Sequence, residues 1–132
     1  MKSKQQKTFT FVGTTPNVTL KEEDEKWVKF TIKALLSHFG RDTEKSVAVL
    51  SDGADSVGLM AKYEAKHLEA HQGNIHADSI IPWNLEAALL VSDGVVVVLD
   101  PEIDVDEEAL QKAYVGKQVL VISPADEKLF TL

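Results

Sequence analysis

The residues with the clearest chemical potential lie in the segment Ser51–Ser56, which reads SDGADS. It follows the apolar run Ser46–Leu50 and precedes a helical pattern, so it joins a buried strand to a helix N-terminus. The free N–H groups at such a terminus favour an anion, and Gly53 lets a ligand approach the backbone closely. Since the segment has two carboxylates and no cation, Asp52 and Asp55 favour the hydroxyl groups of a ribose over a bare phosphate. A tight turn, with Asp55 or the next residue as helix N-cap, is the alternative.

A second polar segment, Gly13-Thr14-Thr15, follows the β-type run Thr8–Val12. Its hydroxyl and amide groups are suited to hydrogen bonding with a small polar ligand. An ordinary turn introduced by Pro16 accounts for the same residues equally well. Both segments follow strands, so a parallel sheet would bring them to the same edge.

The segment Asp100–Glu108 contains six carboxylates in nine residues, for which three interpretations compete. In the first, Asp104, Asp106 and Glu107 stabilise a helix N-terminus and face solvent. In the second, one carboxylate enters a cleft as a catalytic nucleophile or base. In the third, the cluster binds Mg²⁺ or Ca²⁺, although it lacks the spacing of an EF-hand loop. The first is favoured, and we predict no metal site.

Histidines are also close together in the sequence. His67 and His71 are four residues apart, a spacing at which two helical side chains can share a metal, and His76 follows nearby. The glutamate of an HExxH motif is absent, so a structural or solvated role is favoured. The chain also lacks GxGxxG, a Walker lysine loop and a GxSxG elbow, and we expect no cofactor.

Composition sets the class of protein. The chain has 132 residues, 44% of them apolar and 27% charged, values typical of one globular domain. It contains no Cys, which excludes disulfides and thiolate chemistry. The net charge is −7 and Arg41 is the single Arg, so we expect no nucleic-acid partner. The longest apolar run, Val95–Leu99, is too short to span a bilayer, and the start MKSKQQK lacks a signal-peptide core, which predicts a cytoplasmic protein without membrane contact.

Short β-type runs alternate with helical patterns, which predicts a parallel sheet flanked by helices. The expected strands are Thr8–Val12, Ser46–Leu50, a segment within Asn74–Ile81, Val95–Leu99 and Lys117–Ile122. The expected helices begin near Thr19, Ser56, Pro82 and Val105, and end near Gly40, His71, Asp93 and Val115. Together they predict a single Rossmann-like α/β domain over residues 1–132, a three-layer α/β/α structure with a mainly parallel sheet of about five strands. We expect residues 1–7 to form a flexible arm and residues 123–132 a loosely packed tail.

Local features accompany these elements. Thr19 and Glu22 predict a capping box, as do Asp104 and Glu107, and Pro82 is expected in the first turn of its helix. The aromatic residues assigned to the core are Phe9, Phe11, Trp27, Tyr63 and Trp83, the last of which is also suited to stack on a base. Since ligands of such sheets bind beyond the carboxyl ends of the strands, the loops of interest are 13–18, 51–56, 81–84, 100–106 and 123–125.

Two stretches resemble a known group of proteins. The run Val49–Ala65, an apolar strand followed by Ser-Asp-Gly-Ala-Asp and a helical pattern around Tyr63, is similar to the Ser-Gly-Gly-Ala loop and helix of the SLOG superfamily, the DprA and Lonely-guy branch of Rossmann-like proteins. Trp83–Val95 is similar to a second stretch of that family and retains its Asn as Asn84. The family's PGGxGT phosphate loop is replaced by Asp100–Val105. The resemblance implies a Rossmann-like fold that binds a nucleotide, with Asn84 orienting the ligand.

The acidic region resembles nucleoside 2-deoxyribosyltransferases instead. In those enzymes a β-run ending in Asp precedes a helix with a nucleophilic Glu and then a Gly-Lys pair, which Asp100, Glu108 and Gly116-Lys117 match in spacing. The resemblance implies that Glu108 attacks or stabilises the anomeric carbon of a ribosyl group while Asp100 or Asp52 holds its hydroxyls. An exposed position beside Lys112 is the alternative for Glu108.

Both families handle nucleosides or nucleotides, so we expect this protein to bind a nucleotide or nucleoside derivative above the strand ends. A sensor or sequestering module is the leading interpretation. One alternative is an N-glycoside hydrolase or deoxyribosyltransferase that uses Glu108, and the other is a small acidic protein-interaction domain without a ligand. Because the resembling families commonly form dimers, the resemblance also implies a homodimer.

Overall fold

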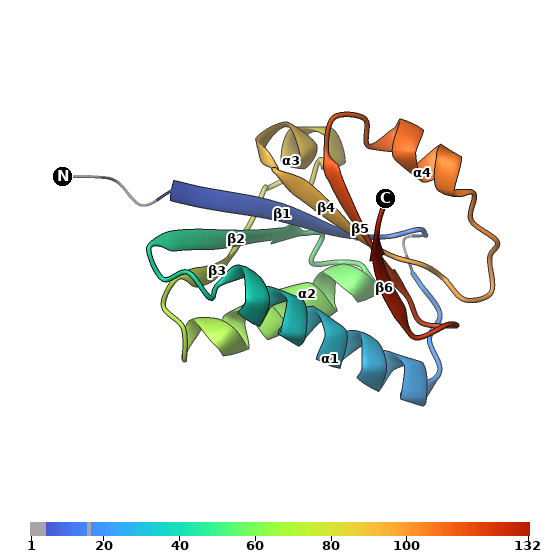
Figure 1. Cartoon of the computed structure of the whole chain (residues 1–132), viewed down its shortest axis with the longest axis horizontal. Coiled ribbons are helices and arrows are strands. Elements are labelled where there is room, and N and C mark those ends of the chain that lie inside the picture. Colours follow the sequence, from blue (N-terminus) through green and yellow to red (C-terminus); the bar gives the residue numbers. More distant parts are fainter. Residues whose placement is uncertain (1–4, 16) are drawn as a thin grey trace.

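The computed structural model describes residues 5–15 and 17–132, and its centre is a six-stranded sheet with the order β3-β2-β1-β4-β5-β6 (Figure 1). The strands are β1 (Gln5–Gly13), β2 (Lys45–Ser51), β3 (Ile75–Asp78), β4 (Gly94–Val98), β5 (Gln118–Ser123) and β6 (Lys128–Thr131). Strands β1 to β5 pair in parallel, while β6 pairs antiparallel with β5. The predicted Rossmann-like α/β fold with a mainly parallel sheet is therefore confirmed.

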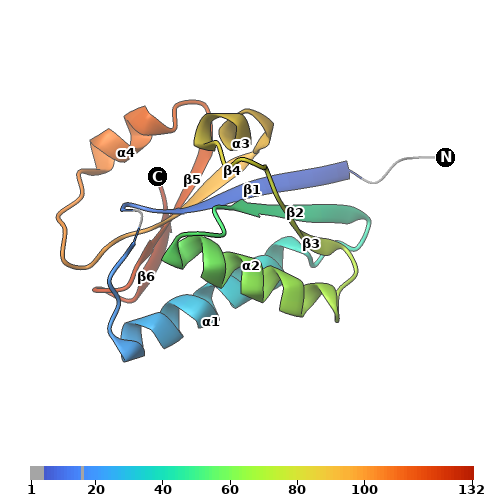
Figure 2. The same cartoon turned by 180° about the vertical axis from the view of Figure 1, so that it is seen from behind.

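Helices cover both faces of this sheet. α1 (Glu22–Phe39) and α2 (Ser56–Glu69) lie against one face, and α3 (Leu85–Val91) and α4 (Glu107–Ala113) lie on the other (Figure 1, Figure 2). The connections after β1 and β4 thus leave the sheet toward opposite faces, although these two strands are neighbours. Such a topological switch point is where sheets of this kind bind ligands. Within the described ranges, every helix is too short or too polar to cross a membrane.

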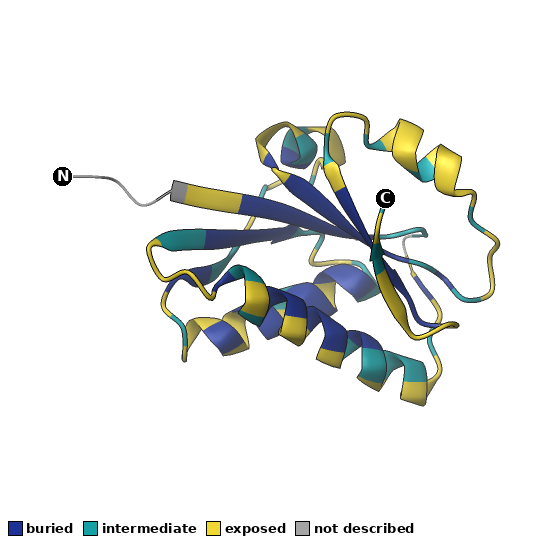
Figure 3. Ribbon diagram, viewed as in Figure 1, coloured by how far each residue is buried: buried dark blue, intermediate teal, exposed yellow. Residues whose placement is uncertain are grey.

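The core follows the alternation of side chains along the strands. On the side of α1 and α2, Phe9 and Phe11 of β1 belong to one buried cluster, and Val12 belongs to a second cluster on the opposite side. The residues Val95–Val98 of β4 alternate between the two clusters and are all fully buried. Figure 3 shows the burial concentrated in the sheet and in the inner sides of α1 and α2, whereas α4 is largely exposed. The unbroken apolar run of β4 had predicted this central position.

Both chain ends differ from the prediction. The expected flexible arm over residues 1–7 is wrong for residues 5–7, which form the start of β1 and pair with Lys45–Val47 of β2; residues 1–4 lie outside the described residues. The expected loose tail is also wrong, because Lys128–Thr131 forms the edge strand β6. Phe130 packs against the second core cluster, and this burial stabilises the pairing.

Three helices begin later in the sequence than predicted. The N-cap of α1 is Lys21, which makes no side-chain cap hydrogen bond, so the predicted capping box of Thr19 does not form. The N-cap of α4 is Asp106 rather than Asp104, and its carboxylate accepts a hydrogen bond from the amide of Glu108. α3 begins after Asn84, so Pro82 precedes the helix instead of occupying its first turn. In each case the cap lies two residues or more after the predicted one, and before α1 a contact between the amide of Thr19 and Asp100 accounts for the delay.

Candidate functional site

The predicted ligand loops lie at one edge of the sheet. In the parallel ladders, Gly13 at the end of β1 is paired with Val98 of β4, and Phe11 is paired with Ser51 of β2. The three strands are neighbours, so the segments that follow them emerge at the same carboxyl edge. Tertiary structure therefore brings Gly13-Thr14-Thr15, Ser51–Asp55 and Asp100 to one side of the molecule, as the predicted site requires.

Hydrogen bonds join the loops that follow β1 and β4. The amide of Thr14 donates to the carbonyl of Val98 at 3.1 Å, and the amide of Asp100 donates to the hydroxyl of Thr14 at 3.0 Å. Thr15 donates its hydroxyl to Oδ2 of Asp100 at 3.4 Å, and the amide of Thr19 reaches the same oxygen at 3.5 Å. The switch point is thus built around the side chain of Asp100, which holds the two loops together.

The carboxylate of Asp100 is buried, with only 5% of the residue exposed. Its Oδ1 accepts a hydrogen bond from the amide of Glu102 at 2.9 Å, a usual length. The two hydrogen bonds to Oδ2 are longer than usual, so this oxygen retains capacity to accept a stronger one. Asp100 is therefore suited to position the β1 loop, and its direct contact with a ligand stays a prediction.

The loop between β2 and α2 is held by its own side chains. Asp55 is the N-cap of α2 and accepts a hydrogen bond from the amide of Gly58, which confirms the cap interpretation. Oδ1 of Asp52 accepts one from the amide of Ala54 at 2.9 Å, and the hydroxyl of Ser51 donates to the carbonyl of Gly58 at 3.0 Å. Both carboxylates are half-buried and have a second oxygen beyond these contacts, so capping and ligand binding are compatible.

We expect Asp55→Asn to stabilise the protein modestly at pH 7. Burial raises the pKa of the Asp55 carboxyl, partly offset by the hydrogen bond from Gly58, and the charge of Asp52 raises it further. The native carboxyl therefore binds its proton more tightly than the unfolded one, so ionisation of Asp55 lowers the stability as pH rises above 3.8, its usual value. Asparagine keeps the cap and removes the charge. Melting curves should show a gain of roughly 1–3 °C at pH 7 that disappears below pH 4; a loss at pH 7 would contradict this.

The two predicted glycines differ in what surrounds them. A Cβ at Gly13 would lie 2.5 Å from Val18 and 2.9 Å from the carbonyl of Thr15, so close packing of the loop explains this glycine. A Cβ at Gly53 would meet only Nζ of Lys62, at 3.8 Å, which is an ordinary contact. Packing therefore does not require Gly53, and its surroundings leave the backbone open to a ligand.

Lys62 is a further candidate for the site, which the sequence patterns did not indicate. It lies in α2, yet its ammonium group lies beside Gly53 in the loop that precedes the helix. Helical side chains point back toward the N-terminus of their helix, which is how a lysine of the second turn reaches this loop. The loop itself contains no cation, but the folded site does. The helical spacing of Lys62 from the loop was the signal available in the sequence.

A groove adjoins this loop on the outer side of α1 and α2. Its volume is about 610 Å³, within the range of small-molecule sites. Tyr63 and Leu59 expose 69% and 53% of their surface, so the predicted core position of Tyr63 is wrong. The other lining residues are Glu25, Lys29, Ser56, Met60, Lys62 and Lys66. Nζ of Lys29 is 3.0 Å from Glu25, whereas Lys62 and Lys66 form no ion pair within the described ranges. An apolar surface with two available cations therefore lies beside the carboxyl-edge loops.

Asn84 and Glu108 occupy exposed helix starts. Asn84 caps α3 and accepts a hydrogen bond from the amide of Ala87 at 3.1 Å. Glu108 lies in the first turn of α4. The loop between β4 and α4 extends away from the sheet (Figure 1). The exposure expected in the alternative interpretation of Glu108 is therefore observed, and the ligand and catalytic roles of both residues stay predictions.

The three histidines singled out in the sequence lie in two separate places, α2 with the turn after it and β3. The rings of His67 and His71 lie 5.3 Å apart in an edge-to-face arrangement, and both residues are exposed. His76 lies on β3, where its Nε2 is 3.7 Å from a carboxylate oxygen of Asp78. Over residues 5–15 and 17–132, no three His, Asp or Glu side chains are grouped to hold a metal ion.

Comparisons of this chain with protein-family models, with curated proteins and with solved structures found no match. Function is therefore inferred from the residues and their geometry. The strand order and the parallel pairing establish a Rossmann-like α/β topology, and the carboxyl edge of its sheet is the candidate functional site.

Proposed function

We propose that this protein binds a nucleoside or nucleotide derivative at the carboxyl edge of its sheet. The observation that carries the proposal is the convergence on Asp100, whose buried carboxylate accepts hydrogen bonds from Thr15 and Thr19 at the switch point between β1 and β4. Ligands of doubly wound sheets bind in this crevice. The β2–α2 loop, with Asp52 and Asp55, emerges from the strand next to β1.

The chemistry of these residues favours a sugar. Asp52 and Asp55 present carboxylate oxygens, which accept hydrogen bonds from ligand hydroxyls such as those of a ribose. Tyr63 presents an exposed aromatic ring in the adjoining groove, where a flat base can stack. The ligand is thereby held by its hydroxyl groups and its ring, with Asp100 positioning the β1 loop against it.

Charge favours an uncharged nucleoside over its phosphate. Asp52, Asp55 and Asp100 are carboxylates at this edge, and Lys62 is a cation that lies beside Gly53 of the β2–α2 loop. A monophosphate can gain from Lys62 but is repelled by the carboxylates. We expect Lys62→Gln to weaken binding of a nucleoside 5′-monophosphate while leaving that of the nucleoside nearly unchanged.

The resemblance noted in the sequence supports the same class of ligand. Ser51–Asp55 is similar to the loop of the SLOG superfamily, and Asp100 with Glu108 matches the spacing of the nucleoside 2-deoxyribosyltransferases. Membership of the SLOG superfamily is part of this proposal. The replacement of the Gly-rich phosphate loop by Asp100–Val105 agrees with a preference for the sugar over the phosphate.

The proposal is tested with a panel of the common nucleosides and their 5′-monophosphates, by melting temperature and then by calorimetry. At least one nucleoside should raise the melting temperature. Asp52→Asn should weaken its binding about tenfold, since a hydrogen bond to a charged group contributes about 1.5–3 kcal/mol. Asp42→Asn is the matched control, because Oδ1 of Asp42 makes the same turn contact, with the amide of Glu44 at 3.1 Å, and follows α1 at the other edge. Stabilisation by no compound, or equal weakening by both variants, would contradict the proposal.

The same panel tests the catalytic alternative. Each compound is incubated with the protein and separated by chromatography, which detects release of the free base. A binding protein without catalysis releases none. Base released by the wild type and not by Glu108→Ala would instead assign an N-glycosidic bond cleavage to Glu108.

A further inference from the structure

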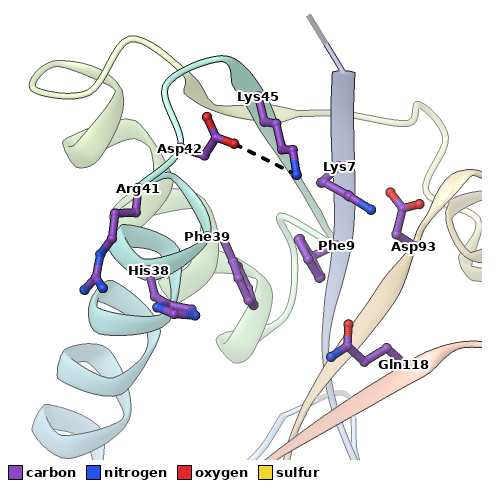
Figure 4. Close-up of a pocket in the computed structure, with 9 residues that line it drawn as sticks. All are labelled: Lys7, Phe9, His38, Phe39, Arg41, Asp42, Lys45, Asp93 and Gln118. Atoms are coloured by element: carbon purple, nitrogen blue, oxygen red, sulfur yellow. Dashed lines mark ion pairs between the residues drawn. The ribbon is translucent and has the colours of Figure 1, made fainter.

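A cavity of about 580 Å³ lies at the opposite, amino edge of the sheet (Figure 4). Its walls come from the end of α1 and from the starts of the strands, with Lys7 in β1, Lys45 in β2 and Gln118 in β5. The volume is that of a small-molecule site. None of the residues proposed to bind a nucleoside lines it.

The residues that line this cavity have a positive net charge, although the protein as a whole is acidic. Lys7, Lys45 and Arg41, the single Arg of the chain, line it together with Asp42 and Asp93. The lining therefore has a net charge of +1 with His38 neutral, whereas the whole chain has −7. In Figure 4 the Lys45 side chain extends toward β1, the Lys7 side chain points toward Asp93, and Arg41 lies at the outer rim beside His38. A bound anion would gain from this positive charge.

The two carboxylates of the cavity are held by other groups. Oδ2 of Asp93 accepts a hydrogen bond from the amide of Thr8 at 2.8 Å. Asp42 accepts one from the amide of Glu44, and its other oxygen lies 4.0 Å from Nζ of Lys45, a long ion pair. Over residues 5–15 and 17–132, Lys7 and Arg41 form no ion pair. Positive charge is therefore available to a ligand here.

The helix dipole does not explain the whole cluster. His38 and Arg41 lie at the end of α1, where cations stabilise a helix C-terminus. Lys7 and Lys45 belong to strands, so this effect does not account for them. A ligand bound in the cavity would account for the position of these two lysines.

Two stacked aromatic rings form the apolar part of the cavity. The ring centroids of Phe9 and Phe39 lie 4.1 Å apart, and the rings are nearly parallel at 6°. Phe9 is buried, while Phe39 is half-buried and keeps part of its ring accessible. An apolar surface next to the ammonium groups of Lys7 and Lys45 favours a ligand with an apolar ring and an anionic group.

We infer that the amino edge holds a second binding site, for a small organic anion. Its phosphate or carboxylate group would lie between Lys7 and Lys45, with Arg41 closing the rim, and its ring would pack on Phe39. Arginine suits either anionic group, because its planar guanidinium can donate two parallel hydrogen bonds. This inference is independent of nucleoside binding at the carboxyl edge.

Nuclear magnetic resonance of the ¹⁵N-labelled full chain tests the inference, with phenyl phosphate, benzoate, inorganic phosphate and phenol as probes. Phenyl phosphate and benzoate report which anionic group is preferred. Saturable shifts are expected at the backbone amides of Lys7, Phe39, Arg41 and Lys45. Phenol and inorganic phosphate, which each lack one half of the proposed ligand, should bind more weakly than phenyl phosphate. The affinity should fall as salt is added, because ions screen the lysines.

The variant Lys7→Gln/Lys45→Gln should raise the Kd for phenyl phosphate about tenfold or more. Lys33→Gln/Lys112→Gln removes the same charge from exposed positions on α1 and α4, away from both proposed sites, and should leave the Kd unchanged; the melting temperatures of both variants show that they fold. The inference is overturned if neither organic anion gives saturable shifts at millimolar concentrations, if phenol binds as tightly as phenyl phosphate, or if both variants weaken binding equally. Nucleosides are expected to shift other amides, so the two sites are tested separately.

Discussion

Gly58→Ala is expected to lower the melting temperature by roughly 10 °C, although alanine favours a helix more than glycine does. Gly58 lies in the first turn of α2 and is buried. A Cβ at this position would lie 1.8 Å from the carbonyl oxygen of Asp52 and 2.7 Å from its carbonyl carbon. These are backbone atoms, so the loop itself must move. Overpacking usually costs 1–3 kcal/mol, and with a backbone neighbour we expect about 3 kcal/mol.

The same substitution should also abolish nucleoside binding, because Asp52 and Asp55 cannot keep their positions when the loop moves. Gly53→Ala is the matched control in the same loop. Its Cβ would make one ordinary contact, with Lys62, so we expect a change in stability of less than about 1 kcal/mol. Thermal and urea unfolding of both variants measure the difference. If Gly58→Ala melts within a few degrees of the wild type, the close approach of helix and loop is not present in solution.

Asn74→Ala is expected to cost about 2–3 kcal/mol, since the two N–H groups of its side-chain amide are shared among three carbonyls and each contributes about 1 kcal/mol or more. The buried amide group of Asn74 donates to the carbonyls of Gly40 at 2.8 Å, Lys45 at 3.0 Å and Asp42 at 3.3 Å. It thereby ties the end of α1 to the start of β2. Without it, these carbonyls lose a donor in a buried position. Urea unfolding measures the loss.

A second variant separates hydrogen bonding from side-chain size at this position, and a control variant removes an exposed helix cap elsewhere. Asn74→Asp has nearly the same shape but cannot donate when ionised, so it should destabilise at least as much as alanine at neutral pH. Stability should partly return in acid, where the protonated carboxyl group can donate once. Asn84→Ala removes an exposed cap with one hydrogen bond and should cost only about 1 kcal/mol. Equal losses for Asn74→Ala and Asn84→Ala would contradict the role given to Asn74.

Much of the fold could be predicted because it depends on local patterns. The unbroken run Val95–Val98 predicted a strand covered on both faces, and it is the fully buried β4. Helical periodicity identified α1, and the alternation of strands and helices predicted the parallel sheet. That topology in turn placed the loops after β1, β2 and β4 at one edge. These predictions hold because the periodicity of buried residues and the connections of a parallel sheet depend little on which side chains contact each other.

The errors arose where a contact between distant segments decides the outcome. Thr19 fits a capping box by its sequence, but its amide faces Asp100, which is 81 residues away. Tyr63 fits the apolar pattern of α2 but lies on its exposed side. The last strand, β6, forms because Phe130 finds an apolar surface on the sheet.

The amino-acid sequence by itself therefore determined the fold class, the central strands and the edge at which the loops meet. Tertiary structure alone decided that Lys62 lies beside Gly53, that Asp100 joins two loops, and that Lys7 and Lys45 face one cavity. The physical reason is that the spacing of apolar residues along the chain is a local signal for helices and strands. The chemistry of a site depends instead on distances between side chains that only packing brings together.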